Sequence, residues 1–184
     1  MNKQSFVRAA AAAALLSCLS FGAMAAEMPL GDTKEISGME IASVYLQPIT
    51  MDKVMGLPAA RSDIHLELDI HALKDNPHFS EGWWIPYLTI DYTLEKLEKD
   101  KPTHTQKGTL MAMVADDGPH YGSNIKLNGP GKYRASFVIK NPGKNKLEMF
   151  GRHIDKETGV PEWFDDIKVQ WTFNYAGTGK KGGY

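Results

Sequence analysis

The sequence predicts an all-β protein in which antiparallel strands pack as a β-sandwich. Stretches of alternating apolar and polar residues recur along the chain, as expected for strands whose side chains point to opposite faces in turn. Clusters of Gly, Pro, Asn and Asp separate these stretches, and helical spacing of apolar residues is scarce. Several strands at such spacing are typical of a sandwich. We expect strands at 34–37, 39–48, 63–74, 84–95, 107–113, 122–127, 131–140 and 167–175, and a short helical turn within 159–166.

The last two expected strands have the clearest apolar faces. Turn sequences at 129–131 and 141–143, each containing Pro and Gly, bound the first of them. Polar residues lie between the apolar positions, which are Tyr133, Ala135, Phe137 and Ile139 in the first strand and Val169, Trp171, Phe173 and Tyr175 in the second.

The first 25 residues have the features of a signal peptide for export. Lys3 and Arg8 precede an apolar run over 9–19 that is too short to span a membrane. Ala23-Met24-Ala25 then fits a cleavage site between small residues. We therefore assign residues 1–25 to the signal peptide and expect a periplasmic protein.

Cysteine occurs once, at Cys18, within the predicted signal peptide. A lipoprotein-type cleavage site at this residue is the weaker alternative, because a better site follows directly. After cleavage the chain has no thiol, which excludes a cysteine nucleophile, a thiolate zinc or iron–sulfur site and a blue-copper centre.

The remaining chain is expected to form one β-sandwich metal-binding domain over 26–176, followed by a disordered Gly- and Lys-rich tail at 177–184. Loss of two basic residues with the signal leaves 19 basic against 22 acidic residues. Because no basic stripe is present, we expect no nucleic-acid partner. No later segment is long and apolar enough to span a bilayer.

The most informative stretch is 64–71, where Ile and Leu alternate without a break with polar residues. His65, Glu67, Asp69 and His71 share the polar face of the expected strand. These side chains bind metals or transfer protons, and a metal would need further ligands from other parts of the chain. The alternative is an ordinary solvated face of a sandwich strand.

A second candidate lies around the Asp-Asp-Gly-Pro turn. Met113 is expected to end a strand before the turn, and His120 opens the segment after it. A tight turn would bring these two side chains close together, with Asp117 between them. In the alternative, Met113 fills the core and His120 decorates a loop.

Two further features have functional and structural interpretations. His153 lies in a polar loop, and the adjacent Arg152 could pair with a carboxylate of the first candidate strand or hold a residue that contacts the metal. Trp83 and Trp84 are adjacent on an expected strand, so one is expected in the core and the other at the surface. An exposed Trp would also suit carbohydrate binding.

Several phrases together resemble the periplasmic iron-uptake protein family, whose members bind copper and work beside an inner-membrane iron permease. The resemblance covers roughly 35–175. It depends on the phrases Val44-Tyr45-Leu46-Gln47-Pro48, Ser62-Asp63-Ile64-His65-Leu66-Glu67, Trp84-Ile85-Pro86-Tyr87-Leu88, Asp117-Gly118-Pro119-His120-Tyr121-Gly122 and Gly151-Arg152-His153-Ile154-Asp155-Lys156-Glu157-Thr158-Gly159-Val160.

The resemblance implies an immunoglobulin-like sandwich, a homodimer and a copper site. Carried over by position, the copper ligands are His65, Met113, His120 and His153, and Glu67 lies at or beside the copper. Met111 is the less favoured choice of methionine. A second metal position, or residues that support the first, would involve Asp69, His71 and Asp117.

The predicted function is binding of copper and iron in high-affinity iron acquisition, with delivery of iron to an inner-membrane permease. Imidazole and thioether ligands together tolerate both oxidation states of copper, which is compatible with a copper-assisted redox step on iron. A multicopper oxidase would need more histidines. The alternatives are a copper carrier or buffer without an iron role and, less favoured, a carbohydrate- or peptide-binding sandwich.

Overall fold

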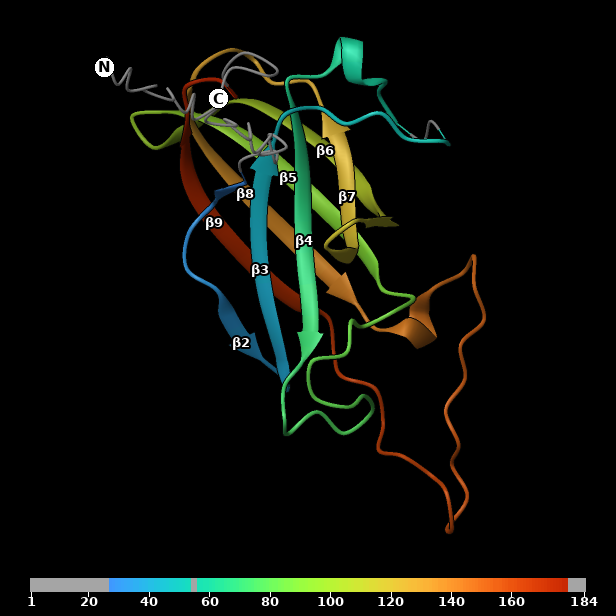
Figure 1. The fold of residues 1–184 in the computed structure, drawn as a ribbon. Coiled ribbons are helices and arrows are strands. Elements are labelled where there is room, and N and C mark those ends of the chain that lie inside the picture. Colours follow the sequence, from blue (N-terminus) through green and yellow to red (C-terminus); the bar gives the residue numbers. More distant parts are fainter. Residues whose placement is uncertain (1–26, 54–55, 179–184) are drawn as a thin grey trace, which may run out of the picture.

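The computed structural model describes residues 27–53 and 56–178 (Figure 1). The predicted signal peptide, with Cys18, lies outside the described residues, as does 179–184 of the predicted tail. Within the described part, the elements are β1 (Met28–Pro29), β2 (Lys34–Ile36), β3 (Met39–Leu46), η1 (Ala59–Arg61), β4 (Ile64–Ala72), β5 (Thr89–Glu98), β6 (Lys101–Ala115), β7 (Gly118–Ile125), β8 (Gly131–Lys140), η2 (Pro142–Lys144) and β9 (Ile167–Tyr175).

The strands form two layers that share one strand. Hydrogen-bonded neighbours follow the order β1-β3-β4-β7-β6-β5-β8-β9, with β2 also on β3, and every pairing is antiparallel. Strand β6 pairs with β5 up to Leu110 and with β7 from Met111 onward, so it passes from one layer to the other. The sheet thus curls over itself (Figure 1), which confirms the sandwich expected from the sequence.

The core fills the space between the two layers. Strand β4 contributes its even-numbered residues, all buried, and β9 alternates between buried and exposed positions along its whole length. The fully buried residues include Tyr121, Tyr133, Phe137, Met39, Ile41, Ile64, Leu66, Leu68, Ile70, Ile85, Ile90 and Leu94. The polar face of β4 therefore points away from this core.

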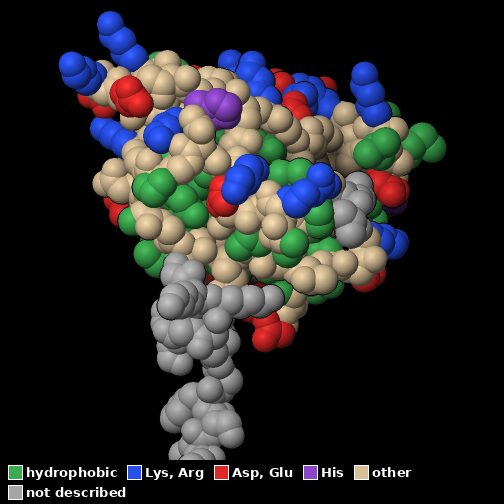
Figure 2. Space-filling view, turned by 90° about the horizontal axis from the view of Figure 1, so that it is seen from above, with side chains coloured by type: hydrophobic (Ala, Val, Ile, Leu, Met, Phe, Trp, Pro, Cys, Tyr) green, Lys and Arg blue, Asp and Glu red, His purple; other side chains and the backbone are tan. Residues whose placement is uncertain are grey.

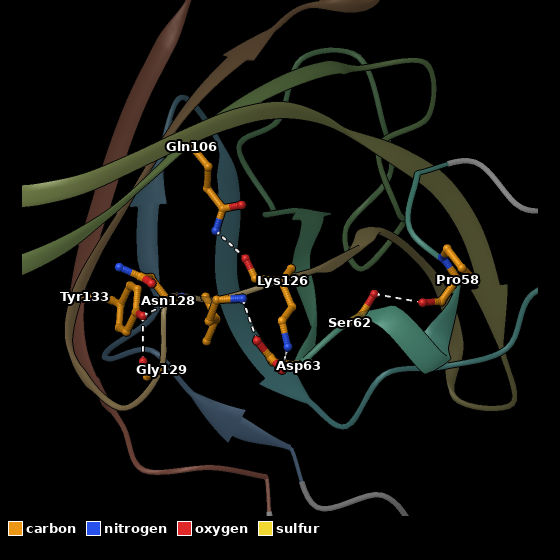
Figure 3. Close-up of polar contacts among 9 residues, drawn as sticks. Pro58, Ser62, Asp63, Gln106, Lys126, Asn128, Gly129 and Tyr133 are labelled. Atoms are coloured by element: carbon orange, nitrogen blue, oxygen red, sulfur yellow. Dashed lines mark hydrogen bonds and ion pairs between the residues drawn. The ribbon is translucent and has the colours of Figure 1, made fainter.

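Hydrogen bonds at one end of the sandwich tie the strands together (Figure 3). The Tyr133 hydroxyl donates to the Gly129 carbonyl oxygen at 2.7 Å and accepts from the Asn128 amide at 3.1 Å. A tyrosine that bonds back to the backbone a few residues upstream is a feature of immunoglobulin-like sandwiches. Nearby, Asp63 accepts from the Leu127 amide at 2.7 Å and from Lys126 Nζ at 2.6 Å.

The starts of three strands differ by four or more residues from those expected. The strand expected at 84–95 begins at Thr89, because Pro86 has no amide to donate and Tyr87 has a φ of 61°. Strand β6 starts six residues earlier than expected, directly after a two-residue turn at Lys99 and Asp100. Strand β7 begins at Gly118 rather than at residue 122, and no helix forms within 159–166.

The end-on view shows basic and acidic side chains interspersed, with hydrophobic groups between them (Figure 2). Neither sign of charge occupies this face alone. No helix within the described residues has the length and hydropathy needed to cross a membrane.

Candidate metal centre

The strongest candidate site lies on the outer face of the β4–β7 sheet. His65 and Glu67 project from β4, and their register partners on β7 are Asn124 and Gly122. His120 lies two residues before Gly122 and therefore shares the same face of β7. Neighbouring strands thus bring together residues that are 55 positions apart.

The three side chains form a compact group. Glu67 Oε1 lies 3.5 Å from His65 Nε2 and 3.4 Å from His120 Nε2. One potential ligand atom from each residue lies within 4.8 Å of the other two. All three residues are buried, and neither Nε2 atom has a hydrogen-bond partner among the described residues. Buried nitrogens without partners are costly unless something binds them.

Close packing shapes the site around His65. A Cβ atom added to Gly122 would lie 2.5 Å from His65 Nε2 and 3.0 Å from its Cε1. Only glycine leaves room for the imidazole at this position of β7. On its other side, His65 Nδ1 contacts Asn124 Oδ1 at 2.9 Å.

Burial controls the charge of the group when no metal is bound. It lowers the pKa of His65 to about 4, an effect that His120 reinforces and the contact with Asn124 opposes. Burial, assisted by the nearby Asp69, Glu27 and Asp117 carboxylates, raises the pKa of Glu67 to about 8. Both side chains therefore favour their uncharged forms at neutral pH, and their contact is not an ion pair.

Met113 lies next to this group, as the sequence predicted from the turn. Strand β6 ends at Ala115, Asp116 and Asp117 form the turn, and the register sets Met113 directly opposite His120. A groove of about 720 Å³ opens beside them. Its lining includes Glu67, His120, Met113, Met111, Met51 and Asp117.

Carboxylates surround the outer part of the site. Burial raises the pKa of Asp69, and the nearby His120 and His71 partly offset this increase. Burial also raises the pKa of Glu27, and the nearby Asp117 and Asp69 carboxylates raise it further. The sequence singled out Asp69, His71 and Asp117 but missed Glu27, which precedes β1 and has no local motif to identify it.

His153 is not brought to the group within one chain. It lies in the segment between η2 and β9, which projects from the sandwich (Figure 1), and its side chain is 75% exposed. Its Nδ1 contacts Thr158 Oγ1 at 2.8 Å, and that hydroxyl donates to Asp155 Oδ2 at 2.7 Å. Because the hydroxyl proton goes to Asp155, His153 carries its proton on Nδ1 and leaves Nε2 free.

Arg152 does not pair with a carboxylate of β4. Its guanidinium donates to the Val160 carbonyl oxygen at 3.0 Å and lies 3.8 Å from Glu162. The Val160 amide in turn donates to the His153 carbonyl oxygen at 3.0 Å. Within one chain, Arg152 therefore braces the loop that carries His153 and forms no ion pair with the described residues of β4.

The adjacent tryptophans separate as expected. Trp83 is 63% exposed, whereas Trp84 packs against the core, with its ring 5.0 Å from that of Tyr121. Trp83 alone of the pair is at the surface.

The sequence profile of a family described as Fe²⁺ transport protein matches residues 24–177. The chain belongs to this family. The match confirms the resemblance drawn from the motifs and covers the whole described sandwich.

Two solved structures of about half identical sequence have the same fold. Copper-reconstituted P19 of Campylobacter jejuni is 53% identical, with a TM-score of 0.77 over 84% of this chain and 99% of P19. FetP of uropathogenic E. coli strain F11 is 48% identical, with a TM-score of 0.76 over 83% of this chain and 97% of FetP. A UPF0423 protein of Brucella abortus is 51% identical in an alignment of 184 positions that covers 99% of this chain and all of that protein.

Proposed function

We propose that this protein binds copper and iron in the periplasm and delivers iron to an inner-membrane permease. Copper would be held by His65, Glu67, Met113 and His120 of one chain and by His153 of a second copy. The periplasmic location is inferred from the export signal at 1–25, which lies outside the described residues.

The observation that carries the proposal is the pair of buried imidazole nitrogens without partners. An unsatisfied buried polar atom costs about 1–3 kcal/mol, so two of them facing one carboxylate are poorly explained by stability alone. A cation between them would satisfy both nitrogens and would favour the ionised form of Glu67. The donor set therefore fits a metal ion.

The choice of copper follows from ligand chemistry and family membership. Imidazole and thioether ligands suit copper, and Met113 lies opposite His120 in the β6–β7 hairpin. P19 has been solved in a copper-reconstituted form. At this site, bound copper would supply a redox-active cation beside the carboxylates.

Iron would bind as cargo among the outer carboxylates. Asp69 and Asp117 are near Glu67, and Glu27 adds a third carboxylate to the group that sequence analysis proposed. Oxygen ligands suit hard cations such as iron, and Asp117 and Glu27 are exposed. Such a position would be weak enough for the iron to be passed on.

A homodimer would supply the missing histidine. The loop that carries His153 also exposes three large apolar residues, Leu147 at 91%, Met149 at 100% and Ile154 at 79%. Large apolar groups clustered on one projecting loop favour a protein interface. Because the His153 side chain is exposed and only its Nδ1 is hydrogen-bonded among the described residues, we propose that its Nε2 binds the metal of the second copy.

Copper titration of the purified protein tests the ligand set. We expect His120→Ala to weaken copper binding by roughly 100-fold or more, equivalent to about 2.7 kcal/mol. His104→Ala is the matched control, because His104 is an exposed histidine on β6 outside the proposed site. Equal affinities of wild type and His120→Ala would overturn the assignment.

Mixing two inactive variants tests whether His153 acts across the dimer. His120→Ala and His153→Ala chains, unfolded and refolded together, should regain roughly a quarter of the sites, because half of the statistically paired dimers hold one complete set. A mixture of His120→Ala with His65→Ala should regain none. Recovery in neither mixture, with dimers present, would show that all ligands come from one chain.

A copper carrier without an iron role is the second candidate, because it would use the same copper ligands. Growth of a deletion strain separates the two functions. We expect the strain to grow poorly under iron limitation and normally under copper stress. The opposite result would favour the copper carrier.

A further inference from the structure

Asn124 connects the metal centre with the chain segment that follows β3. This residue of β7 is 3% exposed, and its side chain makes four polar contacts, two at Oδ1 and two at Nδ2. Its Oδ1 contacts His65 Nδ1 at 2.9 Å and accepts from the Ile49 amide at 3.2 Å. Its Nδ2 donates to the carbonyl oxygens of Ile49 at 2.8 Å and Leu57 at 3.2 Å.

These contacts determine which way the amide faces. A flipped Asn124 amide would set its NH₂ group against the Ile49 N–H and its oxygen against two carbonyl oxygens. The oxygen must therefore face His65, and since it can only accept, His65 Nδ1 carries the proton. His65 Nε2 is left with its lone pair directed toward Glu67.

We propose that Asn124 is a positioning residue that acts on both the ligand and the wall of the groove. It fixes the His65 tautomer that can bind a metal through Nε2, and it fastens the backbone at Ile49 and Leu57 beside the site. Between these two points, Met51 to Lys53 line the groove. The metal-binding part of this inference rests on the proposed function, whereas the tautomer and the fastened backbone do not.

Substitutions of Asn124 can separate its two roles. In Asn124→Asp an oxygen still accepts from His65, but the two N–H donors to the Ile49 and Leu57 carbonyl oxygens are lost. Asn124→Ala removes every contact. Asn141 provides the matched control: it is also a buried asparagine, 5% exposed, and it donates to the Phe164 carbonyl oxygen at 2.7 Å, outside the metal centre.

The tautomer is measured in the metal-free protein by long-range ¹H–¹⁵N correlation spectra of the imidazole rings. We expect His65 to carry its proton on Nδ1 in wild type, Asn124→Asp and Asn141→Ala, and to lose this preference in Asn124→Ala. Amide exchange at Ile49 should be faster in Asn124→Ala, which removes the oxygen that accepts from this amide. A proton on Nε2 in wild type, or an unchanged ring in Asn124→Ala, would overturn the proposal.

Titration with Cu²⁺ then measures the consequence for the metal. We expect Asn124→Ala to bind Cu²⁺ roughly 10- to 100-fold more weakly, as for other residues that orient a metal-binding histidine, and Asn124→Asp to lose less. Native affinity in Asn124→Ala would overturn the positioning role alone. If the wild type bound no Cu²⁺, the proposed function would be overturned, and with it the effect of Asn124 on metal binding. The spectra and the amide exchange would still test the His65 tautomer and the fastened backbone.

A general loss of stability would give a different pattern. Asn141→Ala should lower the unfolding midpoint while leaving copper affinity and the His65 ring unchanged. If it weakened Cu²⁺ binding as much as Asn124→Ala does, the effect would be one of fold stability and the proposal would fail.

Discussion

Gly122 limits the space available to His65. Alanine at this position would place a Cβ atom 2.5 Å from the imidazole nitrogen that faces Glu67. Since the strand backbone cannot move far, the ring must move, and we expect Gly122→Ala to lose copper affinity and about 1–3 kcal/mol of unfolding free energy. Copper titration and urea denaturation would measure the two effects.

Gly151→Ala is a suitable control for this change. A Cβ atom at Gly151 meets no heavy atom within 4 Å, and this glycine lies in the same loop as His153 rather than beside His65. If both alanine variants bound copper equally well, the steric argument at Gly122 would be wrong.

Glu67 predicts a pH dependence of stability in the metal-free protein. The pKa of Glu67 in the folded protein is about 8, above the ordinary 4.5. The contribution of Glu67 to the free energy of unfolding is therefore complete below pH 4.5 and is lost as the pH rises through 8. The pKa of His65 in the folded protein is about 4, below the ordinary 6.5. Its contribution to the free energy of unfolding is therefore complete above pH 6.5 and is lost as the pH falls through 4. We expect Glu67→Gln to gain stability relative to wild type between pH 5 and 9, measured by urea denaturation with a chelator present. A stability difference that stays constant over this range would contradict the burial of the carboxyl group.

The residues of the site differ in how far the sequence could identify them. Alternation in β4 identified His65 and Glu67, because strand geometry alone sets which residues share a face. It could not predict that this outer face is buried, because the contacts of Asn124 with Ile49 and Leu57 join residues 67 and 75 positions apart. Asn124 itself went unnoticed, since an asparagine in a strand has no motif that distinguishes it.

The Tyr133 corner should stabilise the connection between β7 and β8. Tyr133→Phe removes the hydroxyl that bonds Gly129 and Asn128, and we expect a loss of about 1–3 kcal/mol in unfolding free energy. Tyr92→Phe is the control, because the Tyr92 hydroxyl makes no hydrogen bond to the described residues. Thermal denaturation would compare the two variants. Equal unfolding midpoints would show that the hydrogen bonds of the Tyr133 hydroxyl do not stabilise the protein.

Strand positions were predicted well where alternation was uninterrupted. Strands β4, β8 and β9 lie where the sequence placed them, since each has one continuous apolar face. The expected strand at 84–95 began late because backbone conformation at Pro86 and Tyr87 outweighed its apolar character. Local hydrophobicity does not record such backbone constraints.

At the scale of the whole molecule, metal binding should raise thermal stability. A ligand that binds the folded state alone stabilises it by about 2.7 kcal/mol at a free concentration 100 times its Kd. We expect Cu²⁺ to raise the unfolding temperature of wild type and a chelator to reverse the shift. Calorimetry of His120→Ala should record little change, and an equal shift in that variant would indicate copper bound elsewhere.

His153 is the proposed ligand that one chain does not bring to the buried group of His65, Glu67 and His120. Its loop was identified from sequence phrases, but no spacing rule states which copy of a chain a loop reaches. The exposed Leu147, Met149 and Ile154 suggest an interface, and this information became visible only in the folded structure.

Strand β6 belongs to both layers, and this constrains how the sandwich can lose its structure. Residues of β6 up to Leu110 pair with β5 in one layer, and residues from Met111 pair with β7 in the other. Unfolding of either layer therefore removes part of the strand that the other layer shares. Denaturation should therefore be all-or-none, with circular dichroism and tryptophan fluorescence reporting a single shared midpoint.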